Sequence, residues 1–210
     1  MNNPSRVRIK MCGMTRATDI EYATALGVDA IGLIFYQKSP RYVNIECAKG
    51  LLQRMPAFVD AVAVVVNPEA AFVWQVVAEL PIQYLQFHGD ETPAFCEQFG
   101  LPYIKAVPAT SRETIIQAVN DYQQASALLL DTPSTVSRGG LGVSFDWKRV
   151  PSNIGKPLIL AGGLSSLNVR EAMSACSPYA VDVSSGIESS PGIKEYDKMS
   201  QFVRVVRGEE

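Results

Sequence analysis

The chain has 210 residues, of which 47% are hydrophobic and 19% are charged, and its formal net charge at pH 7 is −2. This length is enough to bury a sizeable core, so we expect a single domain over residues 1–210. The balanced charge, with no run of five like charges, disfavours nucleic acid and anionic membranes as partners.

The N-terminus and the cysteines narrow the class of protein further. The stretch MNNPSRVRIKMCGM lacks the apolar core of a signal peptide, and the longest apolar runs fall far short of the roughly 18 residues of a membrane span. The four cysteines form no CxxC pair, and His88 is the only histidine. We therefore expect a cytoplasmic protein with no disulfide scaffold and no metal site.

A short apolar run followed by a helical stretch recurs along the chain. The expected strands are Val7–Met11, Ala30–Ile34, Ala61–Val66, Tyr84–Phe87, Tyr103–Val107, Leu128–Leu130, Leu158–Ala161 and Ala180–Val183. These runs are continuous and rich in aliphatic and β-branched residues, which is typical of parallel strands buried on both faces.

The intervening segments have helical periodicity. TDIEYATALG carries a capping box, Thr18 with Glu21, and ends at Gly27, while PEAAFVWQVVAEL places Pro68 at the first helical position. The same period predicts helices in IECAKGLLQRM, which Gly50 weakens, and in TPAFCEQFG, SRETIIQAVNDYQQ, NVREAMSAC and EYDKMSQFVRVV. The segment FDWKRV is the least regular of the expected helices.

Eight strand–helix units predict an α/β fold with a parallel sheet. Two architectures fit this pattern: a closed (β/α)8 TIM barrel and an open doubly wound sheet. The number of units favours the barrel. No early strand leads into GxGxxG or GxxxxGK[ST], which counts against nucleotide binding.

Polar side chains interrupt strands that should be apolar, and they mark a candidate site. Because side chains alternate along a strand, Arg8, Lys10 and Cys12 share one side of the first strand while its aliphatic residues face the helices. Cys12 then points into the C-terminal mouth of the barrel, where barrel enzymes place their chemistry. We expect one cleft there, lined by Cys12, His88, Asp131, Asp182 and Ser184.

Each of these residues also has a plain structural interpretation. Cys12 fits a small core residue, Asp131 a turn residue before TPS, and His88 a hydrogen-bonded loop residue. Asp182 and Lys10 fit a structural ion pair inside the barrel. The other three cysteines lie in helical stretches and fit packing. The residues alone leave both interpretations open.

Glycine-rich loops follow the seventh and eighth expected strands, LAGGLSS and DVSSGIESSPGIK. Barrels often hold a phosphate there, so Gly162, Gly163, Ser185 and Gly186 are phosphate-binding candidates, with ordinary tight turns as the alternative. A third loop, SRGGLGVSFDW, is expected to close over the site. In FYQKSPRYV, Arg41 is either a surface residue or binds a substrate carboxylate through two parallel hydrogen bonds.

Seven motifs occur in a fixed order along the chain: KMCGMT, IGLIFYQKSPRYV, LQFHGDE, LLLDTPS, GGLGVSFDW, LAGGL and VDVSSGIESSPGIK. Together they closely resemble the phosphoribosylanthranilate isomerase family of tryptophan biosynthesis, over roughly Arg6 to Val206. The resemblance implies a (β/α)8 barrel that converts N-(5-phosphoribosyl)anthranilate to 1-(2-carboxyphenylamino)-1-deoxyribulose 5-phosphate. This Amadori rearrangement of a small phosphorylated substrate involves no electron or group transfer, so no cofactor is implied.

The resemblance also implies roles for individual residues. The cysteine of KxCG, here Cys12, is the general base, and the aspartate of LLLDT, here Asp131, is the general acid. Arg41 is implied to hold the anthranilate carboxylate, Asp182 to line the substrate site, and the glycine-rich loops to hold the phosphate. Asp131 must then keep a proton near neutrality, whereas Cys12 must lose one. Our hypothesis is that Lys10 helps Cys12 to form the thiolate.

Two positions depart from the family pattern: Leu141 stands in RGGLG where threonine is expected, and Phe87 stands where leucine is usual. We expect them to affect substrate affinity rather than the acid–base pair. The joint presence of Cys12, Arg41 and Asp131 disfavours a neighbouring isomerase, an indoleglycerol-phosphate lyase and a non-catalytic phosphosugar-binding protein. A redox or covalent role for Cys12 lacks a second cysteine or a histidine at a recognisable spacing. The sequence does not indicate the oligomeric state.

Overall fold

The computed structural model describes residues 6–132, 147, 150–151 and 154–209. Its centre is a closed barrel of eight parallel strands in sequence order, with the first strand paired to the eighth. The strands are β1 (Arg8–Cys12), β2 (Ala30–Ile34), β3 (Asp60–Val65), β4 (Tyr84–Phe87), β5 (Tyr103–Pro108), β6 (Ala127–Asp131), β7 (Leu158–Leu160) and β8 (Ala180–Val183). The predicted barrel is confirmed, and the strand ends differ from the predicted ones by no more than one residue.

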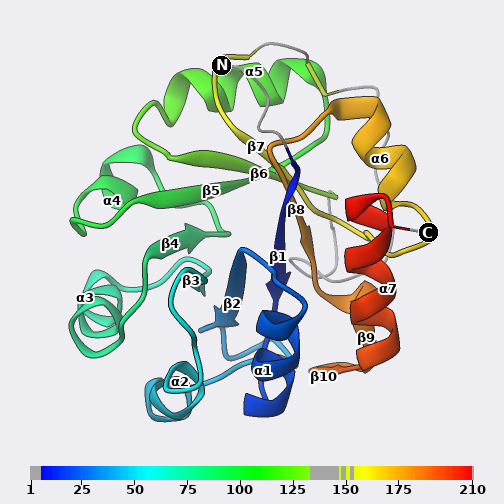
Figure 1. Ribbon diagram of the computed structural model, residues 1–210. Helices are drawn as coiled ribbons and strands as arrows, with labels where there is room; N and C mark the ends of the chain where they lie inside the picture. The colour runs from blue at the N-terminus through cyan, green and yellow to red at the C-terminus, as the bar shows by residue number, and fades with distance from the viewer. Residues whose placement is uncertain (1–5, 133–146, 148–149, 152–153, 210) are drawn as a thin grey trace.

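Helices surround the barrel as an outer ring (Figure 1). Within the described residues they are α1 (Ala17–Ala25), α2 (Ile45–Leu52), α3 (Ala70–Glu79), α4 (Pro93–Glu97), α5 (Arg112–Asp121), α6 (Val169–Cys176) and α7 (Tyr196–Arg207). Between β8 and α7 lie a 3-10 turn, η2 (Ser185–Ile187), and a hairpin of β9 (Glu188–Ser190) and β10 (Ile193–Lys194). The expected helix FDWKRV falls largely outside the described residues. None of the helices in the described ranges is long and apolar enough to cross a membrane.

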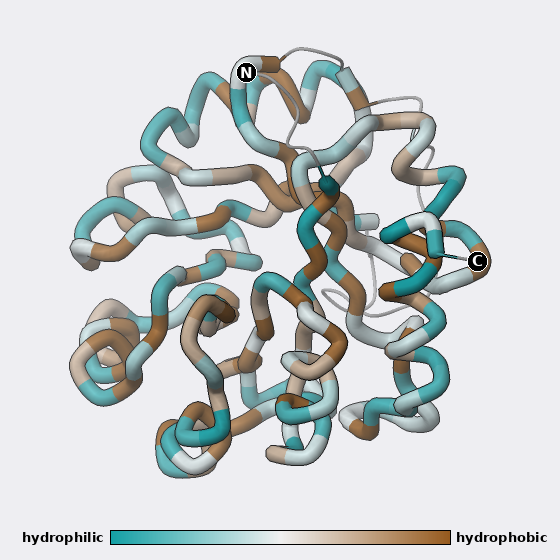
Figure 2. Tube along the Cα trace, in the orientation of Figure 1, coloured by the Kyte–Doolittle hydropathy of each residue, from teal (hydrophilic) through white to brown (hydrophobic). Residues whose placement is uncertain are grey.

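The strands separate two apolar layers. Ile9 and Met11 belong to the outer layer, between the strands and the helices, whereas Cys12, Val62 and Leu129 belong to the layer inside the barrel. Hydrophobic segments follow the central strands, and hydrophilic ones lie on the outward turns of the helices (Figure 2). Each fully buried aliphatic side chain contributes roughly 1.5–3 kcal/mol to folding. The predicted alternation along the first strand is therefore confirmed, with Cys12 facing inward.

The predicted capping box of the first helix is wrong. Helix α1 begins at Ala17, so Thr18 lies inside it, and the N-cap residue Arg16 makes no side-chain cap. Instead, Arg16 donates from Nε and Nη2 to the two carboxylate oxygens of Asp19, at 2.9 and 2.7 Å. The predicted end is confirmed, because Gly27 follows the helix with a φ of +74°, which a glycine adopts without a Cβ penalty.

The predicted start of the third helix is also wrong. Helix α3 begins at Ala70 after the N-cap Glu69, so Pro68 lies in the preceding loop. That loop is shaped by Asn67, which has a φ of +45° and whose backbone N–H donates to Glu91. Gly50 does not interrupt α2, which runs from Ile45 to Leu52.

Candidate active site

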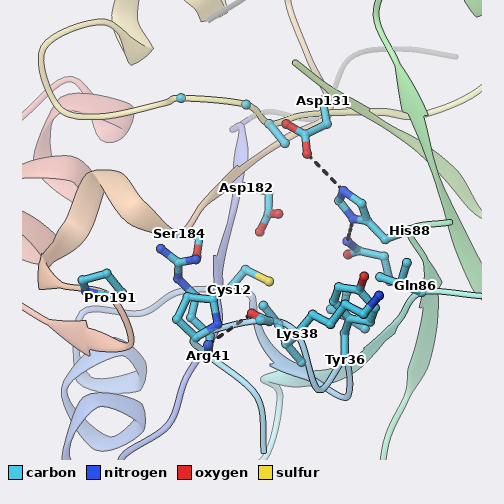
Figure 3. Close-up of a pocket in the computed structure, with 18 of the residues that line it drawn as sticks. Cys12, Tyr36, Lys38, Arg41, Gln86, His88, Asp131, Asp182, Ser184 and Pro191 are labelled. Carbon is cyan, nitrogen blue, oxygen red and sulfur yellow. Dashed lines mark hydrogen bonds and ion pairs between the residues drawn. The ribbon is translucent and has the colours of Figure 1, made fainter. Parts of the chain in front are cut away.

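The C-terminal ends of the strands enclose a pocket with a volume of about 480 Å³ (Figure 3). This volume lies in the range of roughly 300–1,000 Å³ that is typical of small-molecule sites. The lining includes all five residues that the sequence predicted for one cleft: Cys12, His88, Asp131, Asp182 and Ser184. The prediction of a single cleft at the barrel mouth is therefore confirmed.

The phosphate-binding candidates divide into two groups. Gly162 and Gly163, after β7, line the pocket, whereas Ser185 and Gly186, in η2, are not among its lining residues. A Cβ on Gly186 would overlap the carbonyl oxygen of Leu164. Glycine at this position therefore lets the loops after β7 and β8 approach each other closely.

Cys12 occupies a space that its neighbour on β2 leaves open. Gly32 pairs with Cys12 across the two strands, and a Cβ built on Gly32 would lie 2.7 Å from the Cys12 sulfur. The same Cβ would lie 3.1 Å from Nζ of Lys10. The missing side chain at Gly32 thus makes room for both the thiol and the lysine.

Lys10 and Asp182 form a buried ion pair directly beside the thiol, with Nζ donating to Oδ1 at 2.9 Å. Burial opposes the charge of Lys10, yet Asp182 and Cys12 outweigh it and raise the pKa of the lysine. Burial raises the pKa of Asp182, and Lys10 only partly offsets it. The predicted structural pair is therefore present, and it adjoins the candidate base.

The acidity of Cys12 reflects two opposing influences. Burial raises the pKa of the thiol above its ordinary value, and the positive charge of Lys10 lowers it by less. Asp182 adds to the increase, while Lys194 opposes it. Lys10 thus acts in the direction that we hypothesised, but its charge does not overcome burial.

Asp131 closes β6 at the opposite side of the pocket. Its Oδ1 accepts a hydrogen bond from the Thr132 backbone at 2.7 Å, and its Oδ2 lies 3.0 Å from Nε2 of His88. Nδ1 of His88 lies 3.0 Å from Nε2 of Gln86. Figure 3 shows these side chains of Gln86, His88 and Asp131 in one connected row. Gly162 packs so closely that a Cβ there would lie 2.8 Å from Oδ1 of Asp131.

Lys105, the polar residue of β5, supports the loop that carries His88. Its Nζ donates to the Gly89 carbonyl at 2.7 Å and to Glu91 at 3.1 Å. Glu91 in turn accepts from the Gly89 backbone at 2.9 Å. The backbone N–H of His88 donates to the Val65 carbonyl at 2.8 Å. These contacts fix the backbone on which the imidazole stands.

Arg41 lines the pocket but is already engaged by a carboxylate of the protein. Its Nε and Nη2 donate to the two oxygens of Glu188 at 2.7 and 2.6 Å, and both side chains are buried. Lys194 donates to the same carboxylate at 2.8 Å and to the Cys12 carbonyl at 2.7 Å. A buried chain of contacts therefore joins Arg41 to the backbone of the candidate base.

Sequence reasoning missed Glu188 and Lys194. They pair across the β9–β10 hairpin, on either side of the turn. The signal was the turn sequence SSPG between an acidic and a basic residue, which favours a cross-strand ion pair. Nothing local indicates that this pair is buried against Arg41.

Of the two positions that depart from the family pattern, Phe87 lies among the residues that the structure describes and Leu141 does not. Phe87 is fully buried in the outer layer, where it packs against Phe95, Phe99 and Tyr103, so it faces away from the pocket. Leu141 and, apart from Trp147, the loop SRGGLGVSFDW lie outside the described residues.

Comparisons with known proteins agree on one family. The model of N-(5'phosphoribosyl)anthranilate (PRA) isomerase matches residues 9–205. A Legionella pneumophila (strain Paris) protein named N-(5'-phosphoribosyl)anthranilate isomerase is 56% identical over 206 residues, which cover 98% of this chain and 100% of the relative. An Acidithiobacillus ferrooxidans protein of the same name is 50% identical, covering 96% and 98%.

Solved structures give the same result. The phosphoribosyl anthranilate isomerase from Thermotoga maritima superposes with a TM-score of 0.89 at 35% identity, covering 96% of this chain and 99% of that one. A phosphoribosyl anthranilate isomerase in complex with reduced 1-(o-carboxyphenylamino)-1-deoxyribulose 5-phosphate superposes with a TM-score of 0.86 at 34% identity, with the same coverage.

Proposed function

The chain belongs to the N-(5'-phosphoribosyl)anthranilate isomerase family of tryptophan biosynthesis, and on this premise we propose that Cys12 and Asp131 are the acid–base pair of its isomerisation. The observation that carries the proposal is that the ends of β1 and β6 bring these two side chains to one pocket. The substrate is N-(5-phosphoribosyl)anthranilate, and the product is 1-(2-carboxyphenylamino)-1-deoxyribulose 5-phosphate.

The reaction proceeds in two proton-transfer stages. Asp131 protonates the furanose ring oxygen, the bond from C1 to this oxygen breaks, and the anthranilate nitrogen forms the Schiff base with C1. Cys12 as thiolate then removes the proton from C2, which gives an enolamine that tautomerises to the ketone. General acid and base groups of this kind typically contribute about 10²–10⁴-fold each to the rate.

Two lysines beside Cys12 support its role as the base. Burial raises the pKa of the Cys12 thiol and opposes the thiolate, whereas the adjacent charge of Lys10 lowers this pKa and favours the form that the base requires. Lys194 fixes the Cys12 carbonyl from the other side, at 2.7 Å. The base is therefore held in position and has a neighbouring cation that stabilises its reactive form.

The remaining pocket residues are assigned to binding. Glu188 uses the Nε and Nη2 edge of Arg41, which leaves the edge formed by Nη1 and the second Nη2 hydrogen for the anthranilate carboxylate. Asp182 is assigned to the substrate site that it lines. The phosphate is assigned to the loops after β7 and β8, with Gly162, Gly163, Ser185 and Gly186.

A steady-state assay of the loss of phosphoribosylanthranilate fluorescence tests the proposal. The unmutated protein is expected to be active, and Cys12→Ala and Asp131→Ala are each expected to lower kcat by about 10²–10⁴-fold. Cys47→Ala and Asp121→Ala, both at exposed positions, are the matched controls and should retain full activity.

Two outcomes would contradict the proposal. Full activity in Cys12→Ala would mean that another group removes the C2 proton. No activity in the unmutated protein, together with retained binding of phosphate esters, would favour a phosphosugar-binding protein instead.

A further inference from the structure

We propose that His88 is a positioning residue for the general acid, presenting a lone pair at Nε2 to a protonated Asp131. We further propose that Gln86 sets this tautomer, because its Oε1 accepts the hydrogen bond from Nδ1–H. The inference rests on the role proposed for Asp131 and deepens it. It states where the proton is held before the ring oxygen receives it.

The geometry places three side chains in series. Nε2 of His88 lies 3.0 Å from Oδ2 of Asp131, and Nδ1 lies 3.0 Å from the Gln86 amide. Gln86 is 1% exposed, so water does not compete for its amide. The side chains of His88 and Asp131 are 17% and 13% exposed. Both ring nitrogens are therefore committed to protein partners.

Counting protons shows that only one arrangement of a neutral imidazole has Asp131 donating a proton from Oδ2 to His88. A neutral imidazole donates from one nitrogen and accepts at the other. If the Gln86 amide donates to Nδ1, His88 must donate from Nε2, and Oδ2 of Asp131 must then accept and holds no proton in this hydrogen bond. If Gln86 accepts from Nδ1–H, Nε2 accepts from the protonated carboxyl. The second arrangement holds one more proton, and this proton is the one delivered to the ring oxygen.

The Gln86 amide can adopt the orientation that the second arrangement needs. With Nε2 toward His88, the buried Oε1 has no hydrogen-bond partner among the described residues. Turning the amide exchanges its two ends and pairs Oε1 with Nδ1–H. The two ends of an amide are distinguished by the hydrogen bonds that they make, so the chemistry of the row assigns them.

The charged groups around the hydrogen-bonded series of Gln86, His88 and Asp131 come from several strands. Asp131 faces His88 from β6, and Asp182 interacts electrostatically with both residues from β8. Cys12 lies on β1, where Lys10 is paired with Asp182. On the loop that carries His88, Glu91 is neutralised by Lys105 of β5.

The proton of the row returns at the end of the reaction. When Asp131 gives its proton to the ring oxygen, the bond from C1 to that oxygen breaks, and the nitrogen of the Schiff base carries the positive charge. When the enolamine becomes the ketone, C1 takes the proton that Cys12 removed from C2, which restores the thiolate. The C2 hydroxyl gives its proton to the carboxylate of Asp131, which restores the acid. The row therefore needs no net proton from solvent during a turnover.

The single histidine of the chain makes the tautomer directly measurable. In protein labelled with ¹⁵N-histidine, both ring nitrogen signals belong to His88. We expect a protonated Nδ1 over the pH range of activity, in the free protein and in its complex with reduced 1-(o-carboxyphenylamino)-1-deoxyribulose 5-phosphate. An unprotonated Nδ1 with a protonated Nε2 throughout this range would overturn the inference.

Variants at Gln86 connect the tautomer to the rate. Gln86→Met removes the acceptor at similar length and is expected to lower kcat by about fivefold to tenfold. It should also change the alkaline limb of the pH profile of kcat, because the hydrogen bond from Asp131 to His88 is weakened. Gln86→Glu keeps an acceptor and should restore the protonated Nδ1 signal and part of kcat. Gln83→Met, at an exposed position just before β4, should change neither.

The outcomes distinguish a failure of the inference about His88 and Gln86 from a failure of Asp131 as the general acid. If Asp131→Ala is inactive but Gln86→Met has an unchanged pH profile and an unchanged ring signal, Asp131 is the acid and the inference about His88 and Gln86 fails. If Asp131→Ala keeps full activity, the proposed acid itself is wrong, whatever tautomer His88 adopts.

Discussion

Arg41 and Glu188 face each other through two hydrogen bonds, from Nε to Oε1 at 2.7 Å and from Nη2 to Oε2 at 2.6 Å. Both side chains are buried, and Lys194 neutralises the same carboxylate from the other side. A guanidinium held this way cannot rotate freely, so its remaining edge has one orientation in the pocket. Glu188 therefore fixes the orientation of Arg41, as the binding role proposed for this arginine requires.

Glu188→Gln should weaken substrate binding and destabilise the protein. The neutral amide would leave two buried cations without their counterion, and breaking a buried pair in this way typically costs about 3–5 kcal/mol. KM should rise by about tenfold with a smaller change in kcat, since the interaction orients a binding group. Glu46→Gln is the control, because Glu46 is 86% exposed and 3.8 Å from Lys49. Steady-state kinetics and urea unfolding measure both effects, and an unchanged KM in Glu188→Gln would contradict the role of the ion pair.

Stability should also depend on pH through Glu188. Burial raises its pKa, but Arg41 and Lys194 outweigh burial and hold the pKa below the ordinary value. A lowered pKa stabilises the folded state above the ordinary glutamate pKa, and this stabilisation is lost as the pH falls through the folded-state pKa. The free energy of unfolding should therefore fall less steeply on acidification in Glu188→Gln than in the unmutated protein. Urea unfolding at several pH values measures this free energy. If it falls equally steeply with decreasing pH in Glu188→Gln and in the unmutated protein, Arg41 and Lys194 do not stabilise the Glu188 carboxylate.

The pH dependence of activity should be controlled by Cys12 and Lys10. Burial raises the pKa of the thiol, so kcat/KM should increase with pH through the neutral range as the thiolate forms. Lys10→Met removes a charge that lowers this pKa, and the rising limb should move to higher pH. Lys49→Met, at a surface ion pair, should leave the profile unchanged. A pH profile of Lys10→Met identical to that of the unmutated protein would reject the role of Lys10.

Gly32→Ala should impair catalysis without a conformational penalty in the backbone. Its Cβ would lie 2.7 Å from the Cys12 sulfur, so the thiol must move. Displacing a reacting group by about 1 Å typically costs about 10²-fold in rate. Gly50→Ala is the matched control, because nothing lies within 4 Å of a Cβ there, and in α2 it should stabilise the protein by about 0.5–1 kcal/mol. Normal kcat in Gly32→Ala would show that the space beside the thiol is not required.

The part of the site that follows from single strands was predictable from the sequence. Alternation along the first strand placed Cys12 inside the barrel, and polar residues at other strand ends marked His88, Asp131 and Asp182. These predictions succeeded because the closed barrel brings all parallel strand ends to one edge. The roles proposed for Cys12 and Asp131 come from the family resemblance and not from the spacing.

The part that depends on contacts between distant segments was not predictable. Thr18 was expected to cap α1, but Arg16 clamps Asp19, and the backbone of Lys194 also donates to Asp19 at 3.4 Å. Likewise, the burial of Glu188 depends on Arg41, which lies 147 residues away in the chain. Local capping and turn rules contain no information on such partners.

The kinetic isotope effect on kcat, with substrate deuterated at C2 of the ribosyl group, tests the assignment of base and acid most directly. In Cys12→Ser the weaker base should make cleavage of the C2–H bond limiting, so the isotope effect should exceed that of the unmutated protein. In Asp131→Asn ring opening should be limiting, so the effect should be near one. A large isotope effect in Asp131→Asn, with none in Cys12→Ser, would contradict the account.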